Sequence, residues 1–372
     1  MVMTEAALLA LEHQLLWAAL ALGVAFGAIA QRSHFCTMGA IADVVNMGDW
    51  SRVRMWALAA GVAIIGFNAM VALGWVKAAD TIYAAPALLW LSMALGGALF
   101  GFGMVLASGC GSKALVRIGG GNLKALVVFA VLGLSALATM RGAAALLRVA
   151  TVDQLQWTLP AGQDLPSLAA ALGGSPGQRA AALATLVGGA MVAWALARRE
   201  GRSADVLLGG FGIGGVVVAL WWVSGVMGHV DEHPLTLEET FLATNSRRME
   251  SFSFVAPLGY VLDGVMYASD ASRRLTQGMV LVLGVVIGSA AVALAGRSFR
   301  WEGFRGVEDT ANHLVGAVMM GVGGVTALGC TIGQGLSGLS TLSLGSFIAV
   351  ACIVGGAWAA LRWQVWRLER MA

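Results

Sequence analysis

Charged residues are scarce in this sequence. Of its 372 residues, only 12% are Asp, Glu, Lys or Arg, whereas 58% are hydrophobic and the mean hydropathy is +0.80. Soluble globular domains carry about 25% charged residues, so the composition excludes an ordinary soluble protein. The net charge of +3 is too small for a basic surface of the kind that binds nucleic acid, and we expect no nucleic-acid partner.

Motifs for cofactors and metals are also missing. The sequence has four cysteines but no C-x-x-C pair, and it has no Gly-Lys-Ser/Thr phosphate-binding loop. The segment Gly-His-Val-Asp-Glu-His (228–233) superficially resembles a metal cluster, but it falls in a loop with no second ligand group nearby. We therefore expect no metal, no cofactor and no enzymatic activity.

Long apolar runs are what the sequence has instead. A helix needs about 20 mostly apolar residues to span a bilayer, and nine segments meet this length: 12–31, 54–76, 87–108, 122–146, 179–198, 206–228, 275–296, 311–329 and 341–361. Four more apolar stretches are too short or too broken by Gly, Ser or Pro to cross: 33–48, 109–120, 251–268 and 330–340. Broken backbone at membrane depth is tolerated where protein buries it or where it lines a cavity. We predict an all-α integral membrane protein with about nine transmembrane helices plus re-entrant half-helices.

The positive charges predict how the chain sits in the membrane. Most of the 23 Lys and Arg residues fall in alternate loops and near the C-terminus. Cytoplasmic loops carry the excess of Lys and Arg. We expect a multi-pass protein of the bacterial inner (plasma) membrane, with its N-terminus outside and its C-terminus in the cytoplasm.

An internal repeat relates two halves of the chain at an offset of 220 residues. The segment GFGMVLASGC (101–110) matches GVGGVTALGC (321–330) at six of ten positions, and Ser33, Gly39 and Asp43 match residues 253, 259 and 263 in the same register. We predict a first repeat at 1–150 (spans 1–4), an outer loop with a connector span at 151–205, and a second repeat at 206–372 (spans 6–9). The odd number of spans between the repeats inverts the second one. Inverted repeats with broken helices are typical of transporters.

Cysteines stand at equivalent breaks of the two halves. Cys110 and Cys330 each follow a Gly-rich helix and precede a new one, whose N-terminal N–H groups attract anions. Cys36 lies at a third break, although the repeat places Ala256 opposite it. The alternative for each is tight packing, since a free cysteine is often only a small buried hydrophobe. We expect Asp43 and Asp263 in the broken segments to cap the helices that follow.

Small polar residues and cations flank the three cysteines. We predict that the substrate path is lined by Cys36, Cys110, Cys330, Ser33, Thr37, Ser108, Gly109, Gly111, Ser112, Ser253, Gly329, Thr331 and Gln334. Arg32, His34 and Lys113 are candidates for attracting an anion, although Arg32 also fits an interfacial anchor.

Four blocks of the sequence resemble the YeeE/YedE family of sulfur-compound transporters. They are RSHFCTMGA (32–40), ASGCG (107–111), SFSF (251–254) and LGCTIGQGLSG (328–338), of which the last is the most specific. The resemblance extends from the first span to the last. It implies an hourglass-shaped membrane fold and uptake of thiosulfate past three cysteines in turn, which match Cys36, Cys110 and Cys330. It also implies a small cytoplasmic sulfur-carrier (TusA-like) partner.

The implied mechanism is chemically sound, and two alternatives stay open beside it. A neutral thiol is a weak S–H donor that can hold the soft sulfur of thiosulfate briefly, and conduction needs sites that also release their ion. We therefore expect the three thiols to stay protonated. One alternative is a membrane thiol–disulfide electron carrier, and the other is a transporter of a selenium compound, since some members of the family are linked to selenium metabolism.

Overall fold

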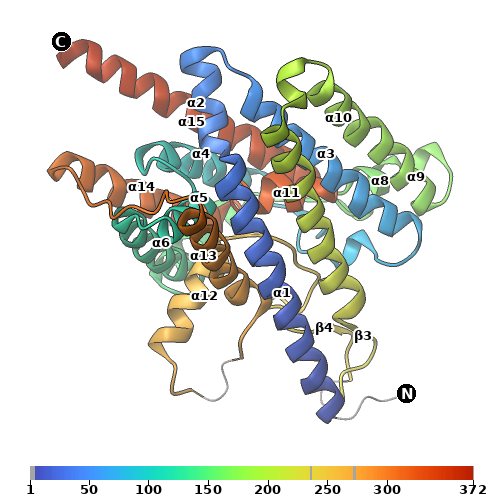
Figure 1. The fold of residues 1–372 in the computed structure, drawn as a ribbon. Helices are drawn as coiled ribbons and strands as arrows, with labels where there is room; N and C mark the ends of the chain where they lie inside the picture. Colours follow the sequence, from blue (N-terminus) through green and yellow to red (C-terminus); the bar gives the residue numbers. More distant parts are fainter. Residues whose placement is uncertain (1–4, 235–236, 271–273, 372) are drawn as a thin grey trace.

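The computed structural model is almost entirely helical, as the composition predicts (Figure 1). It describes residues 5–234, 237–270 and 274–371. The helices of 17 or more residues are α1 (Glu5–Ser33), α3 (Ser51–Ala72), α4 (Trp90–Leu106), α6 (Leu123–Arg141), α11 (Ala204–Trp222), α13 (Gln277–Ala295), α14 (Val307–Thr326) and α15 (Leu344–Met371). The shorter α-helices are α2 (Thr37–Met47), α5 (Gly111–Gly119), α7 (Ala143–Ala150), α8 (Leu165–Leu168), α9 (Pro176–Leu183), α10 (Gly189–Leu196) and α12 (Val255–Met266).

Short irregular elements complete the chain. Three are π-helical: η4 (Ala184–Gly188), η6 (Val223–Met227) and η7 (Gly333–Gly338). Four are single 3₁₀ turns: η1 (Ala78–Asp80), η2 (Val152–Gln154), η3 (Ala169–Leu172) and η5 (Arg199–Arg202). Two antiparallel pairs of two-residue strands lie in loops, β1 (Ala87–Leu88) with β2 (Trp157–Thr158) and β3 (His229–Val230) with β4 (Thr240–Phe241).

Eight helices of the described residues are long and apolar enough to cross a membrane. Four of these eight join adjacent elements: α1 with α2, α4 with α5, α9 with η4 and α10, and α11 with η6. The ninth predicted span, 311–329, falls mainly on α14, a 20-residue helix. Its first two turns hold the polar residues Asp309, Asn312 and His313, which lower its mean hydropathy below that of the others. The prediction of an all-α membrane protein is confirmed.

Each of the four broken stretches contains a short helix. They are α2, α5, α12 and η7, with 11, 9, 12 and 6 residues respectively. At a rise of about 1.5 Å per residue, none of them is long enough for a hydrocarbon core about 30 Å thick. Their ends therefore have to lie inside the protein, where neighbouring helices supply partners for the free backbone groups.

Helix packing follows the register of the repeat. Adding 220 to the residue numbers carries α3, α4 and α6 onto α13, α14 and α15. One pair of main contacts is exchanged by the same operation: α4 packs on α15 while α14 packs on α6. The helices α3 and α13 pack on α11 and α1, which the offset does not carry onto each other. The helices α4 and α14 also pack on each other at the centre. This exchange is expected for two repeats related by a two-fold axis, while the inversion and the predicted boundaries at residues 150 and 205 stay predictions.

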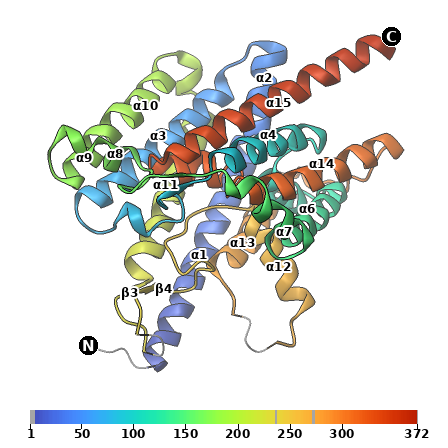
Figure 2. The same cartoon turned by 180° about the vertical axis from the view of Figure 1, so that it is seen from behind.

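The start of α1 and the end of α15 lie at opposite ends of the molecule (Figure 1). Seen from behind, the last turns of α15 project beyond the other helices (Figure 2). The predicted orientation places the two termini on opposite sides of the membrane, and the arrangement is compatible with it. Which side is cytoplasmic stays a prediction from the positive charges.

Candidate functional site

The three breaks that precede the predicted cysteines share one backbone geometry. Before each of them a long helix ends in a left-handed residue, and these residues are His34, Ser108 and Leu328, with φ of 55°, 55° and 56°. A cysteine follows two residues later in every case. A left-handed conformation is costly for a residue with a Cβ, and such strain collects at functional sites. The recurrence of the same turn at three sites makes these breaks candidates for function.

Each cysteine stands at the start of the short element that follows its break. Cys36 is the N-cap of α2, and its Sγ accepts a hydrogen bond from the Gly39 amide at 3.3 Å. The Sγ of Cys330 accepts from the Gly333 amide at 3.4 Å, in the same i to i+3 relation. Cys110 precedes α5, and its Sγ lies 3.2 Å from the Ser112 hydroxyl. The positive ends of short helices therefore converge on the thiols.

Cys110 lies near both of the other two thiols. It is close enough to interact electrostatically with Cys36 and also with Cys330. The backbone of Phe254, the residue before α12, lies within hydrogen-bonding reach of Cys330. A Cβ added to Gly111 would lie 3.8 Å from the Phe254 Cβ. Cys110 and Cys330 are both buried, and Cys36 is half-buried. The structure thus brings the three predicted cysteines into one region, while their role in a path stays a prediction.

A cavity of about 400 Å³ opens beside Cys330. We call it the vestibule. Two predicted residues, Ser253 and Gly329, lie in its wall, and Ser253 also covers Gly333, where a Cβ would meet its hydroxyl at 2.7 Å. Its polar lining also includes Tyr83, Arg141, Arg148, Asn245, Ser246, Glu250, Tyr260, Thr276 and Gln277. Two buried polar atoms of this lining have no hydrogen-bond partner among the described residues, Thr276 Oγ1 and Gln277 Oε1. Arg148 Nε forms an ion pair with the Asp153 carboxylate at 3.5 Å.

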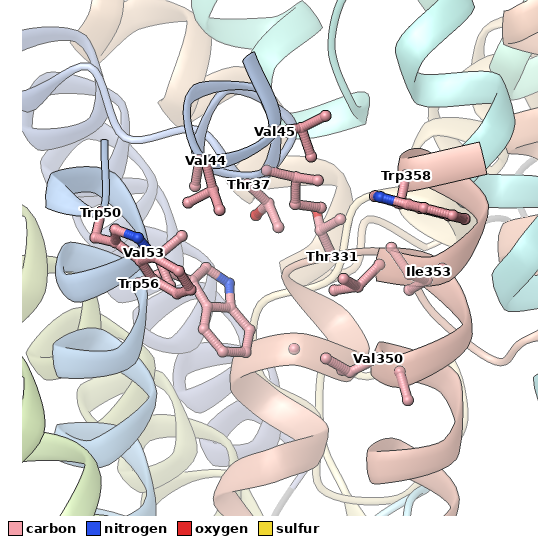
Figure 3. A pocket seen from close by; sticks show the side chains of 16 residues that line it. Thr37, Val44, Val45, Trp50, Val53, Trp56, Thr331, Val350, Ile353 and Trp358 are labelled. Atoms are coloured by element: carbon pink, nitrogen blue, oxygen red, sulfur yellow. The ribbon is translucent and has the colours of Figure 1, made fainter. Parts of the chain in front are cut away.

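Two hydroxyls next to the thiols are also without a partner in the described part of the chain. Thr37 follows Cys36, and Thr331 follows Cys330. Their Oγ1 atoms are buried and unpaired, and both side chains face a cavity of about 520 Å³ between α2, α3, η7 and α15 (Figure 3). The indole N–H of Trp56 faces the same cavity and is likewise unpaired among these residues. Unpaired buried donors of this kind are uncommon and call for a specific explanation, such as a ligand oxygen.

Two cations, Lys113 and Arg52, lie close to Cys36 and do not line the vestibule. Lys113 interacts electrostatically with Cys36 and Cys110, and its stem covers Gly109, where a Cβ would lie 3.1 Å from the Lys113 Cγ. Arg52 lies near His34 and Cys36 and pairs with Asp43 at 3.1 Å. The predicted candidates His34 and Lys113 therefore lie beside the thiols. Arg32 is exposed and pairs with Asp205 at 3.5 Å, which fits an interfacial anchor.

Other predicted path residues bond within the protein. The Ser33 hydroxyl donates to the Ile29 carbonyl of its own helix at 2.7 Å. The Ser108 carbonyl accepts from Arg117 at 3.0 Å. The Gln334 amide is fully buried between the Ala327 carbonyl and the Ser346 hydroxyl, at 2.6 Å from each. These hydrogen bonds stabilise the backbone at the breaks and leave few free polar groups for a substrate.

The prediction that Asp43 and Asp263 cap the following helices is wrong. Both lie inside short helices, and each forms an ion pair with an arginine, Asp43 with Arg52 and Asp263 with Arg141, both at 3.1 Å. A carboxylate buried at membrane depth needs such a partner more than a free helix end needs a cap.

Sequence reasoning missed the ionisable residues of the vestibule. Tyr83, Glu250 and the neighbouring pair Arg141 and Arg148 come from three distant segments of the chain, and no local motif contains them. One signal was present: Tyr83 is among only three tyrosines in the chain, and a second, Tyr260, lines the same cavity.

Comparison with known proteins places this arrangement in a family. The sequence model of the family described as "Sulphur transport" matches residues 32–359. The thiosulfate transporter TsuA of Spirochaeta thermophila is 26% identical over 95% of this chain and 100% of its own length, and TsuA of Escherichia coli is 26% identical over 94% and 95%. A probable transporter, YedE of Salmonella typhimurium, is 35% identical over 28% of this chain and 24% of its own length. The chain therefore belongs to the sulphur-transport (YeeE/YedE) family, whose members are membrane transporters of sulfur compounds and not enzymes.

Proposed function

We propose that this protein takes up thiosulfate, and that the ion passes Cys330, Cys110 and Cys36 in that order. The proposal rests on one observation, that a series of neighbouring groups leads from a cavity through the thiols to cations. The vestibule adjoins Cys330, Cys110 interacts electrostatically with both other thiols, and Cys36 interacts with Lys113. The relatives named thiosulfate transporter match nearly the whole chain and support the choice of ion.

The three cysteine thiols suit thiosulfate chemically. The ion is a dianion whose terminal sulfur is soft and weakly solvated, so a neutral S–H group can hold it without trapping it. A full cation at every step would bind a dianion too strongly in a low-dielectric path. The free hydroxyls of Thr37 and Thr331 add donors for the sulfonate oxygens beside two of the thiols. Each site is then strong enough to admit the ion and weak enough to release it.

Direction follows from the distribution of charge. The positive-inside rule places Arg52, Lys113 and Arg117 on the cytoplasmic side and the vestibule on the outer side of the bacterial inner membrane. Uptake then runs from the vestibule towards the cations. A small cytoplasmic sulfur-carrier protein would receive the ion on the face that carries these cations.

The test is uptake of ³⁵S-labelled thiosulfate into proteoliposomes. Cys110→Ala and Cys330→Ala are expected to lower the initial rate at least tenfold. Cys352→Ala, on α15 and not among the three proposed path cysteines, is the matched control and should transport normally. Unimpaired uptake by both path variants would refute the thiol path. Uptake of labelled selenite in place of thiosulfate, or thioredoxin-reducible Cys110–Cys330 disulfide formation without any uptake, would refute thiosulfate transport in favour of one of the two alternatives.

A further inference from the structure

The cavity that Thr37 and Thr331 face is open towards the bilayer. Apart from those two hydroxyls and the indole N–H of Trp56, its lining is apolar, with Ile41, Val44, Val45, Val53, Val350 and Ile353 among the residues that form it. Figure 3 shows the tryptophans Trp50 and Trp56 on one side of the cavity and Trp358 on the other. Trp50, Val354 and Trp358 are 45%, 42% and 52% exposed, and they lie on or beside membrane-spanning helices. We call this cavity the lateral groove.

The end of α15 carries a repeated pairing of tryptophan with arginine. The guanidinium groups of Arg362, Arg367 and Arg370 lie 5.8, 5.7 and 4.0 Å from the ring centres of the tryptophans four residues before them, Trp358, Trp363 and Trp366. Cation–π pairs of this kind hold an arginine above a ring within about 6 Å. Tryptophan and arginine together mark the level of the lipid headgroups. The first of these pairs stands at the mouth of the lateral groove.

Arg362 is the cation of this ladder that lies nearest to the groove and lacks an acidic partner. Arg367 pairs with Glu308 at 2.8 Å. Arg362 contacts Trp358, and it forms no ion pair with any of the described residues. An unpaired guanidinium beside an apolar groove matches a molecule with a negative head and an apolar tail.

We propose that the lateral groove is the binding site of an anionic phospholipid, with one acyl chain lying between α2, α3 and α15 and its phosphate on Arg362. The groove supplies apolar surface for the chain, and the ladder supplies the charge and the aromatic belt for the headgroup. The bound chain closes the groove on the membrane side. It thereby separates the unpaired hydroxyls beside Cys36 and Cys330 from mobile bilayer lipid.

Two residues allow the chain site and the headgroup site to be tested separately. Gly355 lines the groove, and a Cβ placed on it meets nothing within 4 Å, so Gly355→Phe adds a ring that starts in open space beside the groove. Gly215 on α11 is equally open, and Gly215→Phe adds the same bulk elsewhere. Arg362→Gln removes the headgroup cation, and Arg297→Gln removes an arginine distant in sequence from the ladder.

The experiment is native mass spectrometry of the full chain in nanodiscs of phosphatidylcholine with phosphatidylglycerol at equal amounts. One retained phosphatidylglycerol per chain is expected for the wild type, Gly215→Phe and Arg297→Gln. Arg362→Gln should lower the preference for phosphatidylglycerol about fivefold, the value of one cation near a charged membrane surface, and Gly355→Phe should abolish retention of either lipid.

Retention of phosphatidylcholine and phosphatidylglycerol in equal amounts by the wild type would overturn the assignment of an anionic lipid. Retention by Gly355→Phe at the wild-type level would overturn the assignment of the groove. Neither result depends on transport, so the site stands or falls independently of the thiosulfate path.

Discussion

Gly103 of α4 and Gly316 of α14 lie so close that neither position has room for a side chain. A Cβ on Gly103 would lie 2.7 Å from the Gly316 carbonyl oxygen, and a Cβ on Gly316 would lie 2.6 Å from the Gly103 carbonyl oxygen. The repeat carries this pair onto Gly323 and Gly96, which show the same reciprocal distances of 2.6 and 2.7 Å. The two helices therefore cross in backbone contact near the axis that relates the halves.

Gly316→Ala is expected to destabilise the protein because its methyl group would force α4 and α14 apart. Overpacking of this kind costs about 1–3 kcal/mol. Thermal unfolding in detergent, followed by fluorescence-detected gel filtration, should show a lower midpoint than for Gly215→Ala, whose added methyl meets nothing within 4 Å. Equal midpoints for the two variants would contradict the close crossing.

Much of this architecture could be predicted from the sequence because the bilayer makes hydropathy informative. The stretches of 33–48, 109–120, 251–268 and 330–340 were too short to span, and each contains a short helix. The register that pairs Cys110 with Cys330 also pairs α4 with α14. These features depend on local composition and on internal repetition, which one chain displays directly.

The vestibule could not be predicted, for a physical reason. Its charged and aromatic groups approach one another only after α6, α12 and the loop before α12 have packed. The same limit explains the error over Asp263. Its partner Arg141 is 122 positions away in the chain, so the ion pair could not be recognised from sequence proximity.

Thr37→Val and Thr331→Val are expected to reduce uptake without loss of stability. Neither hydroxyl has a hydrogen-bond partner to lose within the described chain, and valine has nearly the same shape as threonine. A hydrogen bond to a charged ligand contributes about 1.5–3 kcal/mol, so the KM for thiosulfate should rise about tenfold or more. Thr341→Val is the contrast, since its hydroxyl donates to the Gly338 carbonyl at 2.7 Å and its loss should lower the unfolding midpoint. A reduced midpoint with normal KM in Thr37→Val and Thr331→Val would assign the hydroxyls to folding.

Gln334→Met is expected to destabilise the break that holds Cys330. The substitution leaves the Ala327 carbonyl and the Ser346 hydroxyl buried and unsatisfied, at about 1–3 kcal/mol for each group. Adding Ser346→Ala to Gln334→Met should cost less than the sum of the two single changes, because one unsatisfied group is removed with it. Unfolding midpoints of the four proteins in this cycle measure the coupling, and strict additivity would exclude the pairing.

Uptake is expected to fall as the pH rises, because of a carboxyl group in the vestibule wall. Burial raises the pKa of Glu250, and hydrogen bonds from Ser246 oppose this rise only in part. The charged and titratable groups that line the same cavity are Tyr83, Arg141, Arg148 and Tyr260. A raised pKa keeps the carboxyl neutral to a higher pH than usual, and a neutral carboxyl does not repel a dianion.

The pH dependence of the initial uptake rate therefore has a definite sign. As the pH rises through the raised pKa of Glu250, a negative charge appears beside the entry to Cys330, where Arg141 and Arg148 are already paired with Asp263 and Asp153. Initial rates in proteoliposomes should decline from pH 5 to pH 8 in the wild type. Glu250→Gln mimics the neutral form and should hold the high rate throughout this range. Thiosulfate itself stays a dianion over these pH values, so a decline that persists unchanged in Glu250→Gln would place the titrating group elsewhere.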